Sequence, residues 1–450
     1  MTLPEAWRRG EVAVLGLGQS GVAATRLLVQ KGARVYASDT AATPGAGAAV
    51  EALRALAGVT IELGHHDLDR IRRASGVVVS PGVPSDAPAL TAARGAGVPI
   101  VSELDLGFLA LGDMPCIAVT GTNGKTTTTA LVAHLLQTAG LRAEAAGNIG
   151  RPLADVALVP AGLQWLAVEV SSFQLHDSPD FAPAVGVVTN LSPDHLDRYR
   201  DIAAYYADKR LLFRNATDAS VWIVNSDDLA VLALATGVPG RLVRFSLRGP
   251  TDGWYDAAER TLRLGGAALL PRDALALLGN HNVANALAAS LAVLEAGIGP
   301  AAIARGLRSF RALPHRLEPV GEVGGVQWIN DSKATNVAST VVAIEAMDRP
   351  FVLLLGGRHK GEPYTRLAPL LKERCRLVLA YGEAGPLIVR DLAGQVPVER
   401  GGDFADVMAR ARRAARGGEA VLLSPACSSY DLFSNYEERG ATFRRLALVA

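Results

Sequence analysis

The residue types best suited to chemistry stand in the stretch Gly121–Thr126, GTNGKT, which follows an apolar run and precedes a helical pattern. In such a loop, backbone N–H groups surround phosphates, a lysine reaches the β- and γ-oxygens, and a hydroxyl meets Mg²⁺. Val119 stands where the usual pattern has its first glycine, and a plain glycine-rich turn with a surface lysine is the alternative. The strand–loop–helix context favours ATP. The predicted ATP loop comprises Gly121, Thr122, Asn123, Gly124, Lys125, Thr126 and Thr127.

A second glycine loop, Gly16–Gly21 with the sequence GLGQSG, lies between the apolar run Val12–Leu15 and another helical pattern. Asp39 ends the next predicted strand, where an acid would contact a ribose. This loop alone fits an NAD-dependent oxidoreductase, but a helix N-terminus holds any diphosphate. We therefore predict a diphosphate ligand here, with one nucleotide used for binding and the ATP of the other loop used for energy.

Apolar runs that end in polar or glycine residues alternate with helical patterns along the chain. This alternation predicts an α/β protein with parallel sheets, in which ligands bind beyond the carboxyl ends of the strands. The length of 450 residues suits about three domains. A passage with Gly and Pro places one boundary near Glu103, and two prolines in residues 309–321 indicate a linker. The predicted domains are residues 1–103, 104–312 and 313–450.

The composition excludes several classes of protein. Hydrophobic residues make up 49% and charged residues 20%, as in a folded globular chain. With a net charge of +1, the chain has no strong positive electrostatic field that would attract nucleic acid. No apolar run approaches the roughly 20 residues of a membrane-spanning helix. The three cysteines are scattered without a CxxC pair, so we expect neither a disulfide framework nor a structural zinc site. With no secretory apolar region at the start, we expect a cytoplasmic protein. We also expect it to be a monomer.

A series of motifs extends from the central loop to the C-terminal region: GTNGKTTT, GNIG, VEVSSFQL, TNLSPDHLDRY, ADKRLLF, GNHNVANALAA, HRLE, NDSKATN and SPACSSYDLFSNYEERG. With the N-terminal loop, they resemble the Mur ligases of peptidoglycan synthesis over nearly the whole chain, from Val12 to Arg444. VEVSSFQL, NDSKATN and SPACSS are most similar to the members that add glutamate. The resemblance implies an N-terminal Rossmann-like domain for the UDP moiety, a central P-loop ATPase domain with a parallel-rich sheet, and a C-terminal Rossmann-like domain for the amino acid.

The reaction implied by the resemblance joins D-glutamate to UDP-N-acetylmuramoyl-L-alanine with hydrolysis of ATP. The acceptor carboxylate first becomes an acyl phosphate, and the amine then displaces phosphate. Because the carboxylate and the γ-phosphate are both anions, cations must reduce their repulsion. The resemblance therefore implies two Mg²⁺ ions besides Lys125. No residue decides by physical reasoning between D- and L-glutamate.

By the resemblance, Lys125, His195 and Lys209 are catalytic, and CO₂ carbamylates Lys209 so that it bridges a second Mg²⁺. A desolvated or cation-flanked amine has a lowered pKa, which permits that reaction. From the residues alone, Glu169 at the polar end of a strand is a metal-ligand candidate, whereas His195 reads as a surface histidine and Lys209 as an ordinary helix lysine. The implied metal ligands are Thr126, Glu169, His195 and Lys209 as its carbamate.

The resemblance also assigns ligand contacts in each domain. The UDP-sugar contacts are Gly18, Ser20, Asp39, Thr40, Ser80, Gly82 and Asn148. The ATP contacts outside the loop are Asn282, Asn285, Arg316 and Asp331. The glutamate contacts are Lys333, Thr335, Lys360, Ser429 and Tyr436. Helix capping is the alternative for both asparagines, a plain turn is the alternative for Gly82, and His359 or Arg358 could replace Lys360.

Three other functions compete with this one. A folylpolyglutamate-type synthase shares the ATP site, but the N-terminal glycine loop and NDSKATN argue against it. An NAD-dependent oxidoreductase rests on the N-terminal loop alone. A non-catalytic ATP-binding regulator would gain nothing from Glu169, His195 and Lys333. Cys427 is not expected to be a nucleophile, because no base partner stands nearby and acyl phosphate chemistry needs no covalent enzyme intermediate.

Overall fold

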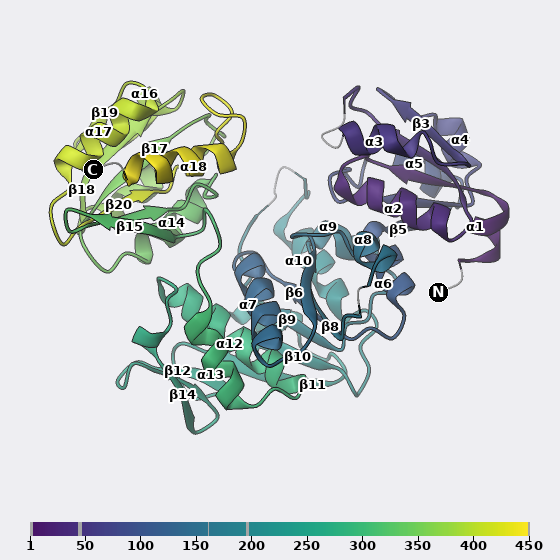
Figure 1. Cartoon of the computed structure of the whole chain (residues 1–450), viewed down its shortest axis with the longest axis horizontal. Helices are drawn as coiled ribbons and strands as arrows, with labels where there is room; N and C mark the ends of the chain where they lie inside the picture. Colours follow the sequence, from purple (N-terminus) through teal and green to yellow (C-terminus); the bar gives the residue numbers. More distant parts are fainter. Residues whose placement is uncertain (1–2, 44–46, 161, 195–197, 449–450) are drawn as a thin grey trace. The chain divides into compact units, whose positions relative to one another are not determined.

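The structure, a computed structural model, describes residues 3–43, 47–160, 162–194 and 198–448, and these residues form three β-sheets with flanking helices (Figure 1). The chain divides into two compact units. The first unit, Met1–Ala274 with Ala284–Arg308, holds two of the sheets, and the second, Leu275–Val283 with Ser309–Ala450, holds the third. The predicted α/β class with parallel sheets is confirmed.

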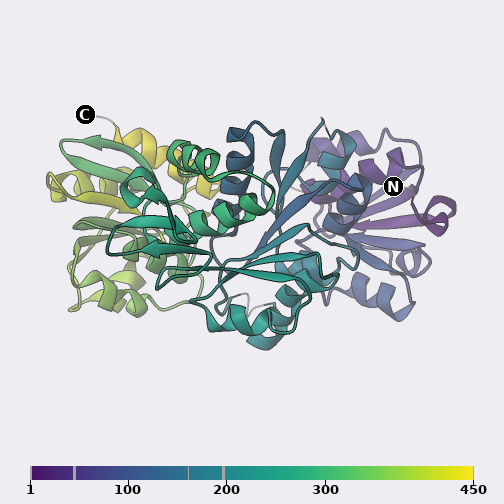
Figure 2. The same ribbon diagram turned by 90° about the horizontal axis from the view of Figure 1, so that it is seen from below.

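The N-terminal sheet contains β1 (Glu11–Leu15), β2 (Arg34–Asp39), β3 (Val59–Leu63), β4 (Gly76–Val79) and β5 (Ile100–Ser102). Its helices are α1 (Glu5–Arg9), α2 (Gln19–Gln30), α3 (Gly47–Leu53), α4 (Leu68–Arg72) and α5 (Pro88–Gly95). The strands are parallel in the order β3-β2-β1-β4-β5. Because strand residues alternate between faces, Val12 and Val14 pack with α2 and α3, while Ala13 and Leu15 pack with α4 and α5. Figure 2 shows helices on both faces of this sheet.

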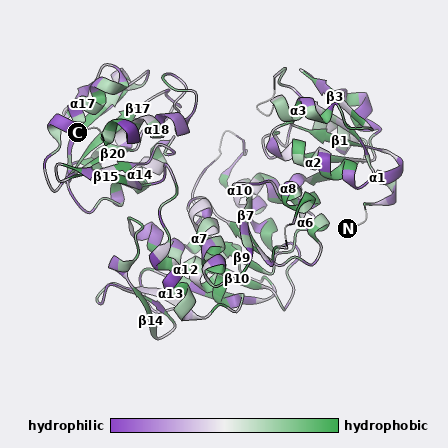
Figure 3. Cartoon of the chain, viewed as in Figure 1, coloured by the Kyte–Doolittle hydropathy of each residue, from purple (hydrophilic) through white to green (hydrophobic). Residues whose placement is uncertain are grey.

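The central sheet has the order β14-β13-β12-β11-β10-β9-β6-β8-β7. Its strands are β6 (Cys116–Thr120), β7 (Ala143–Gly147), β8 (Trp165–Glu169), β9 (Val185–Val188), β10 (Val221–Asn225), β11 (Arg241–Ser246), β12 (Gly253–Asp256), β13 (Thr261–Leu264) and β14 (Ala267–Pro271). All neighbours from β7 to β12 are parallel, and β13 is antiparallel to both of its neighbours. Figure 3 shows the hydrophobic colouring of β9 and β10, whose residues are mostly buried.

Helices flank the central sheet, and several of them begin in the loops that follow its strands. They are α6 (Glu103–Leu111), α7 (Lys125–Thr138), α8 (Leu153–Leu158), α9 (Ser172–His176), α10 (Ile202–Arg210), η1 (Leu211–Phe213), α11 (Leu229–Leu234), η2 (Arg272–Ala274), α12 (Asn280–Glu295) and α13 (Pro300–Ser309). Helix α7 packs against β7 and β8. Helix α9 begins with a capping box, in which Ser171 and Gln174 satisfy each other's backbone N–H groups.

The C-terminal sheet has the order β15-β16-β20-β17-β18-β19, and only its β15–β16 pair is antiparallel among the described strands. The strands are β15 (Glu318–Val323), β16 (Val326–Asn330), β17 (Phe351–Gly356), β18 (Cys375–Tyr381), β19 (Val398–Arg400) and β20 (Ala420–Leu423). The helices are α14 (Val337–Glu345), η3 (Tyr364–Leu367), α15 (Ala368–Leu371), α16 (Gly385–Leu392), α17 (Phe404–Ala414) and α18 (Tyr436–Ala447). One core lies under α14 and α16, and a second lies under α17 and α18.

All three cysteines, Cys116, Cys375 and Cys427, are buried and unbridged. Burial raises the pKa of the Cys427 thiol to about 11, which disfavours the nucleophilic thiolate. Within the described part of the chain, every helix is too short or too polar to cross a bilayer.

Buried polar groups connect the N-terminal and central sheets of the first unit. The hydroxyl groups of Ser102 and Ser178 lie 2.6 Å apart. Glu103 is wholly buried, and its Oε1 accepts the Ala154 N–H of α8 over 2.6 Å. Burial raises the pKa of Glu103 from 4.5 to about 7 and also raises that of Asp105 to about 7. These acids retain protons in the folded chain at pH values where they would ionise in the unfolded chain.

Replacing Glu103 with glutamine should reduce the pH dependence of stability. Because the folded-state pKa is raised, the stabilising contribution is complete below pH 4.5 and is lost as pH rises through about 7. A shift of this size corresponds to roughly 3 kcal/mol. The thermal midpoint of the wild type should therefore fall more between pH 5 and pH 8 than that of Glu103→Gln. If the thermal midpoints of the two proteins changed equally with pH, the raised pKa of Glu103 would be contradicted. Asp105 is present in both proteins and cannot cause a difference between them.

Candidate active site

The central glycine loop joins the carboxyl end of β6 to the N-terminus of α7, as the sequence predicts. Gly121 has a φ of +137° and Gly124 a φ of +82°, in the region that favours glycine. A Cβ atom on Gly121 would lie 2.0 Å from Thr189 Oγ1, and one on Gly124 would lie 2.4 Å from Asn285 Oδ1. Val119 is wholly buried within β6. The turn therefore begins at Gly121, which explains the departure from the usual glycine pattern.

The loop after β9 supports the glycine loop. The Asn123 N–H donates to Asn190 Oδ1 over 2.9 Å, and the Thr122 N–H donates to Asn190 O over 2.8 Å. The buried Thr122 hydroxyl donates to Ser192 O over 3.1 Å. The Thr122 side chain thus fixes the conformation of the loop, while Asn123 is exposed at its tip.

Lys125 folds over its own loop. Its Nζ donates to Gly121 O over 3.1 Å and to Thr122 O over 2.8 Å. Thr126 is buried and Thr127 half-buried in the first turn of α7. A phosphate in this loop would meet the lysine, two hydroxyls and the positive end of a helix.

A buried lysine lies near this loop. Lys209 in α10 is only 1% exposed, and its Nζ lies 4.8 Å from the centroid of the Tyr205 ring. Burial lowers the pKa of Lys209 well below its usual range, and the charge of Lys125 lowers it further. The nearby carboxylates Asp194 and Glu169 raise that pKa to a smaller extent. The structure therefore brings Lys209 together with Lys125 and Glu169 and favours its neutral amine.

Glu169 ends β8 and is 3% exposed. Asn148 Nδ2 donates to Glu169 Oε1 over 2.9 Å, whereas Glu169 Oε2 is buried without a hydrogen-bond partner in the described structure. A buried carboxylate oxygen without a partner is costly unless a cation binds it. Mg²⁺ is usually held by one or two carboxylates, phosphate oxygens and water. Glu169, the Thr126 hydroxyl and a carbamate on Lys209 therefore fit this ion.

The remaining predicted metal ligand, His195, lies outside the described residues. Among the residues that are described, no group of three or more His, Cys, Asp or Glu side chains is arranged to hold a metal ion. The fit to Mg²⁺ thus rests on the unpartnered oxygen of Glu169 and on the oxygen donors around it.

The N-terminal glycine loop is closed by Asp39, whose carboxylate accepts the Leu17 N–H over 2.6 Å. Gly21 has no room for a side chain, because a Cβ atom would lie 1.8 Å from Gly16 O. In contrast, a Cβ atom on Gly18 would meet nothing within 4 Å. The loop is therefore open on the side of Gly18, at the N-terminus of α2, where the strand order reverses between β1 and β4.

The remaining UDP-sugar candidates differ in how firmly they are held. The exposed ones are Thr40, Gly82 and Asn148. Ser80 Oγ donates over 2.8 Å to a carbonyl of the N-terminal glycine loop, and the Ser20 hydroxyl interacts with the buried Glu103 carboxylate. The backbone of Gly82 is not left-handed, and open space surrounds it. A plain turn therefore does not require glycine at this position.

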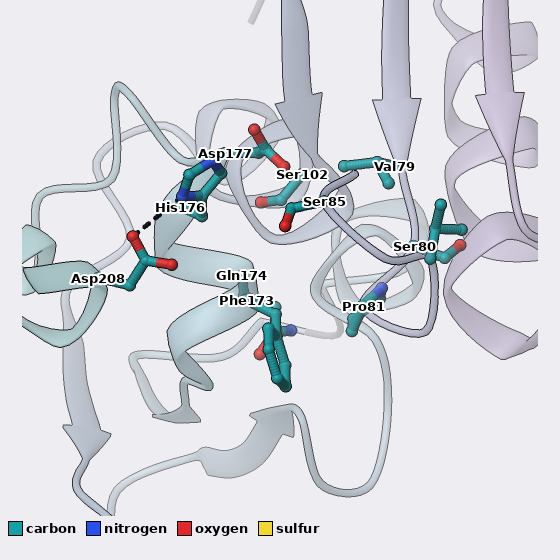
Figure 4. Close-up of a pocket in the computed structure, with 11 residues that line it drawn as sticks. Val79, Ser80, Pro81, Ser85, Ser102, Phe173, Gln174, His176, Asp177 and Asp208 are labelled. Atoms are coloured by element: carbon teal, nitrogen blue, oxygen red, sulfur yellow. Dashed lines mark hydrogen bonds and ion pairs between the residues drawn. The ribbon is translucent and has the colours of Figure 1, made fainter. Parts of the chain in front are cut away.

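A pocket in the first unit lies between the loop after β4 and helix α9 (Figure 4). Ser80, Phe173, His176 and Asp208 are among its lining residues. His176 Nδ1 lies 2.9 Å from Asp208 Oδ1, and this interaction raises the pKa of His176. The sequence does not predict this pair, although Asp208 precedes Lys209, because His176 and Asp208 are 32 positions apart.

Arg198 and its neighbours connect this pocket with α10. The Arg198 guanidinium lies 4.0 Å from the centroid of the Phe173 ring, and its Nη2 donates to Val83 O over 3.1 Å. Phe173 stacks on Tyr199 with the ring centroids 5.3 Å apart, and the Tyr199 hydroxyl donates to Asp208 Oδ2 over 2.9 Å. Contiguous contacts thus join the loop after β4, which carries the UDP-sugar candidates Ser80 and Gly82, to α10, the helix that carries the buried Lys209.

In the second unit, Asp331 follows β16 and is fully engaged by its surroundings. Its Oδ1 accepts the Leu317 N–H over 3.2 Å, and its Oδ2 accepts the Ser424 hydroxyl over 2.9 Å. Burial raises the pKa of Asp331 to about 7, and the charge of Arg316 opposes that rise. His315 and Leu317 have φ values of +63° and +43°, which non-glycine residues rarely adopt. The structure therefore brings Arg316 and Asp331 together at a strained segment.

The glutamate candidates gather in the loops after β16, β17 and β20 and at the start of α18. Lys333 Nζ lies 5.2 Å from the centroid of the Tyr436 ring, and Lys360 Nζ donates to Thr335 Oγ1 over 3.3 Å. Burial, with the nearby Glu437, raises the pKa of Tyr436 to about 12. Ser429 is 2% exposed.

The two asparagine candidates are buried in α12 but belong to different units. In the first unit, Asn285 Oδ1 accepts the Thr128 hydroxyl over 3.2 Å, beside Gly124 of the phosphate loop. In the second unit, Asn282 Nδ2 donates to Leu278 O over 2.8 Å. Asn285 is therefore placed against the loop that we assign to ATP.

Three family models match successive parts of the chain. Residues 10–102 match the model described as Mur ligase MurD-like, N-terminal domain. Residues 119–293 match the Mur ligase middle domain, and residues 315–427 match the Mur ligase, glutamate ligase domain.

Curated relatives are similar over the full length. A UDP-N-acetylmuramoylalanine–D-glutamate ligase from Salinibacter ruber is 41% identical over 460 residues, which cover 98% of each chain. One from Anaeromyxobacter dehalogenans is 42% identical over 461 residues, which cover 99% of each chain.

Solved structures share the fold at lower identity. A pseudomurein peptide ligase type C from Methanothermus fervidus has a TM-score of 0.60 at 18% identity and covers 97% of this chain and 99% of its own. A UDP-N-acetylmuramate-alanine ligase from Thermotoga maritima has a TM-score of 0.60 at 20% identity, with 97% and 98% coverage. Since three successive family models and full-length relatives agree with the phosphate-loop geometry, this chain belongs to the Mur ligase family.

Proposed function

We propose that this chain is an ATP-dependent carbon–nitrogen ligase that adds D-glutamate to UDP-N-acetylmuramoyl-L-alanine in peptidoglycan precursor synthesis. The observation that carries the proposal is the group Lys125, Glu169 and Lys209 beside the phosphate loop, in which a lysine, a buried carboxylate and a buried lysine with a lowered pKa converge. The activity printed for the full-length relatives supports this choice of substrates.

The residues of this chain supply most of the catalytic requirements. Lys125 and the α7 N-terminus bind the β- and γ-phosphates of ATP and reduce their repulsion toward the acceptor carboxylate. Glu169, Thr126, His195 and carbamylated Lys209 would hold two Mg²⁺ ions, which supply further positive charge at the transferring phosphoryl group. The acyl phosphate formed on the acceptor then loses phosphate as the glutamate amine forms the amide bond.

We assign the UDP-sugar to residues 1–103, where the glycine loop is open at Gly18, at the N-terminus of α2. We assign ATP to residues 104–312, with Arg316 and Asp331 as further contacts. The glutamate is assigned to residues 313–450, because two lysines and three hydroxyls suit a dicarboxylate. Three buried, unbridged cysteines favour the reducing cytoplasm as the site of the reaction. A monomer remains our expectation.

The purified chain should release phosphate from ATP only when Mg²⁺, UDP-N-acetylmuramoyl-L-alanine and glutamate are all present. Phosphate release and the product mass are the measurements, and D- and L-glutamate are tested separately because the residues do not select between them. NADH titration followed by absorbance provides the control for the oxidoreductase alternative. Phosphate release without dependence on glutamate, or an amide product with another amino acid only, would reject the proposed substrate.

A further inference from the structure

Arg439 of α18 is a wholly buried arginine that contacts two loops of the C-terminal sheet. Its Nε donates to Ser332 Oγ over 3.0 Å, and its Nη2 donates to Ser332 O over 2.8 Å. Its Nη1 and Nη2 both donate to Cys427 O over 3.1 Å. The guanidinium group therefore bridges the loop after β16 and the loop after β20.

A third loop packs against the same guanidinium group. Gly357 directly follows β17, and a Cβ atom placed on it would lie 3.1 Å from Arg439 Nη1 and 2.2 Å from Ser428 O. Gly357 also has a φ of +132°, so both space and conformation require glycine. The strands β16, β20 and β17 are adjacent and parallel, so Arg439 lies at the carboxyl ends of three neighbouring strands.

The hydrogen-bond partners of Arg439 are unusual for a buried charge. Buried arginines normally pair with carboxylates, because removing a charge from water is costly. In the described structure, Arg439 donates hydrogen bonds to two carbonyls and one hydroxyl, and its charge acts on the buried Asp331 carboxylate without forming an ion pair with it. The fork of donors on an arginine suits such a multiple contact, whereas a lysine offers a single point charge.

The bridged loops carry the side chains assigned to the amino acid. Lys333 and Thr335 follow Ser332, Lys360 follows Gly357, and Ser429 follows Cys427. The remaining one, Tyr436, lies one helical turn before Arg439, and its carbonyl accepts the Ser332 hydroxyl over 2.8 Å. All five glutamate candidates are thus within a few residues of an Arg439 contact.

We propose that Arg439 is a positioning residue that sets the spacing of the glutamate-binding side chains by joining the three loops. The proposal deepens the proposed function and rests on its assignment of glutamate to this unit. Arg439 itself does not touch the substrate. It acts through Ser332, Gly357 and Cys427, whose neighbours bind the two carboxylates.

The test compares Arg439→Lys with Arg445→Lys, an exposed arginine on the same helix. Steady-state kinetics with the three substrates should show a KM for glutamate raised at least about tenfold in Arg439→Lys, as expected when hydrogen bonds from a charged group become misaligned. The KM values for ATP and the UDP-sugar should stay within about twofold of the wild type. Arg445→Lys should match the wild type in all three.

A role in folding alone would lower the active fraction and leave the three KM values unchanged, and that result would overturn the proposal. Ser332→Ala provides a second variant if Arg439→Lys does not fold, because it removes the acceptor of Nε and keeps the arginine. Its glutamate KM should rise about two- to fivefold, and an unchanged KM in this folded variant would overturn the proposal.

A binding measurement separates this proposal from the proposed function. Saturation-transfer NMR with glutamate reports occupancy without turnover. If the wild type binds glutamate without forming amide and Arg439→Lys loses that binding, the ligase activity is rejected and the positioning role stands. If wild type and Arg439→Lys bind glutamate equally, the positioning role is rejected whatever the activity. If the wild type does not bind glutamate, both are rejected.

Discussion

Replacing Lys125 with alanine is expected to lower kcat for amide formation by at least about a hundredfold, on the scale of losing one donor that stabilises transition-state charge. In the structure, Lys125 Nζ is already held over the phosphate loop by the carbonyls of Gly121 and Thr122. Its charge therefore needs little reorganisation to meet the γ-phosphate as the acceptor carboxylate attacks. Initial rates of phosphate release and of product formation measure the effect.

The matched control for this substitution is Lys372→Ala, which removes an exposed lysine outside the proposed site. This control should keep wild-type rates. Amide formation at the wild-type rate by Lys125→Ala would show that the lysine does not stabilise phosphoryl transfer, and the ATP site would have to lie elsewhere.

Replacing Lys209 with alanine should reduce activity by about a hundredfold as well, and short-chain carboxylic acids should restore part of the loss. The buried amine has a pKa well below its usual range, so it is available as the free base that reacts with CO₂. The product of that reaction, a carbamate, is an anion. The positive charge of Lys125 disfavours an ammonium group on Lys209 but would stabilise this carbamate. A small carboxylate in the space left by the side chain would restore the negative charge.

Rescue distinguishes this role from a packing role. Acetate or propionate should raise the rate of Lys209→Ala and should not raise the residual rate of Lys125→Ala. Removing dissolved CO₂ and bicarbonate should lower the rate of the wild type. Full activity of Lys209→Ala without any added acid would rule out the carbamate.

The sequence predicted the phosphate loop because that site is local. Strand β6, the loop and the first turn of α7 are continuous in the chain, so spacing alone fixes which residues surround a phosphate. The valine at position 119 was ambiguous in the sequence. Where a pattern lacks an expected glycine, the tight turn can be absent or can form at a neighbouring residue. The structure shows a shift, with Gly121 in the tight position beside Thr189.

Contacts between distant parts of the chain could not be predicted. Asp331 and Ser424 are 93 residues apart and meet because β16 and β20 are neighbours in the sheet. Arg439 lies 107 residues from Ser332, and nothing in the local pattern of α18 marks it as different from the exposed arginines beside it. Such partners depend on strand order, which alternation of apolar runs leaves undetermined.

The burial of Cys116, Cys375 and Cys427 has a practical consequence for studies of movement in this enzyme. Thiol-directed dyes and spin labels react with accessible thiolates, so the native chain should take up little of them. A pair of new surface cysteines, one in each compact unit, can therefore be labelled without first removing the natural ones. Resonance energy transfer or electron paramagnetic resonance on such a pair would measure the distance between the two labels and show whether it changes during turnover.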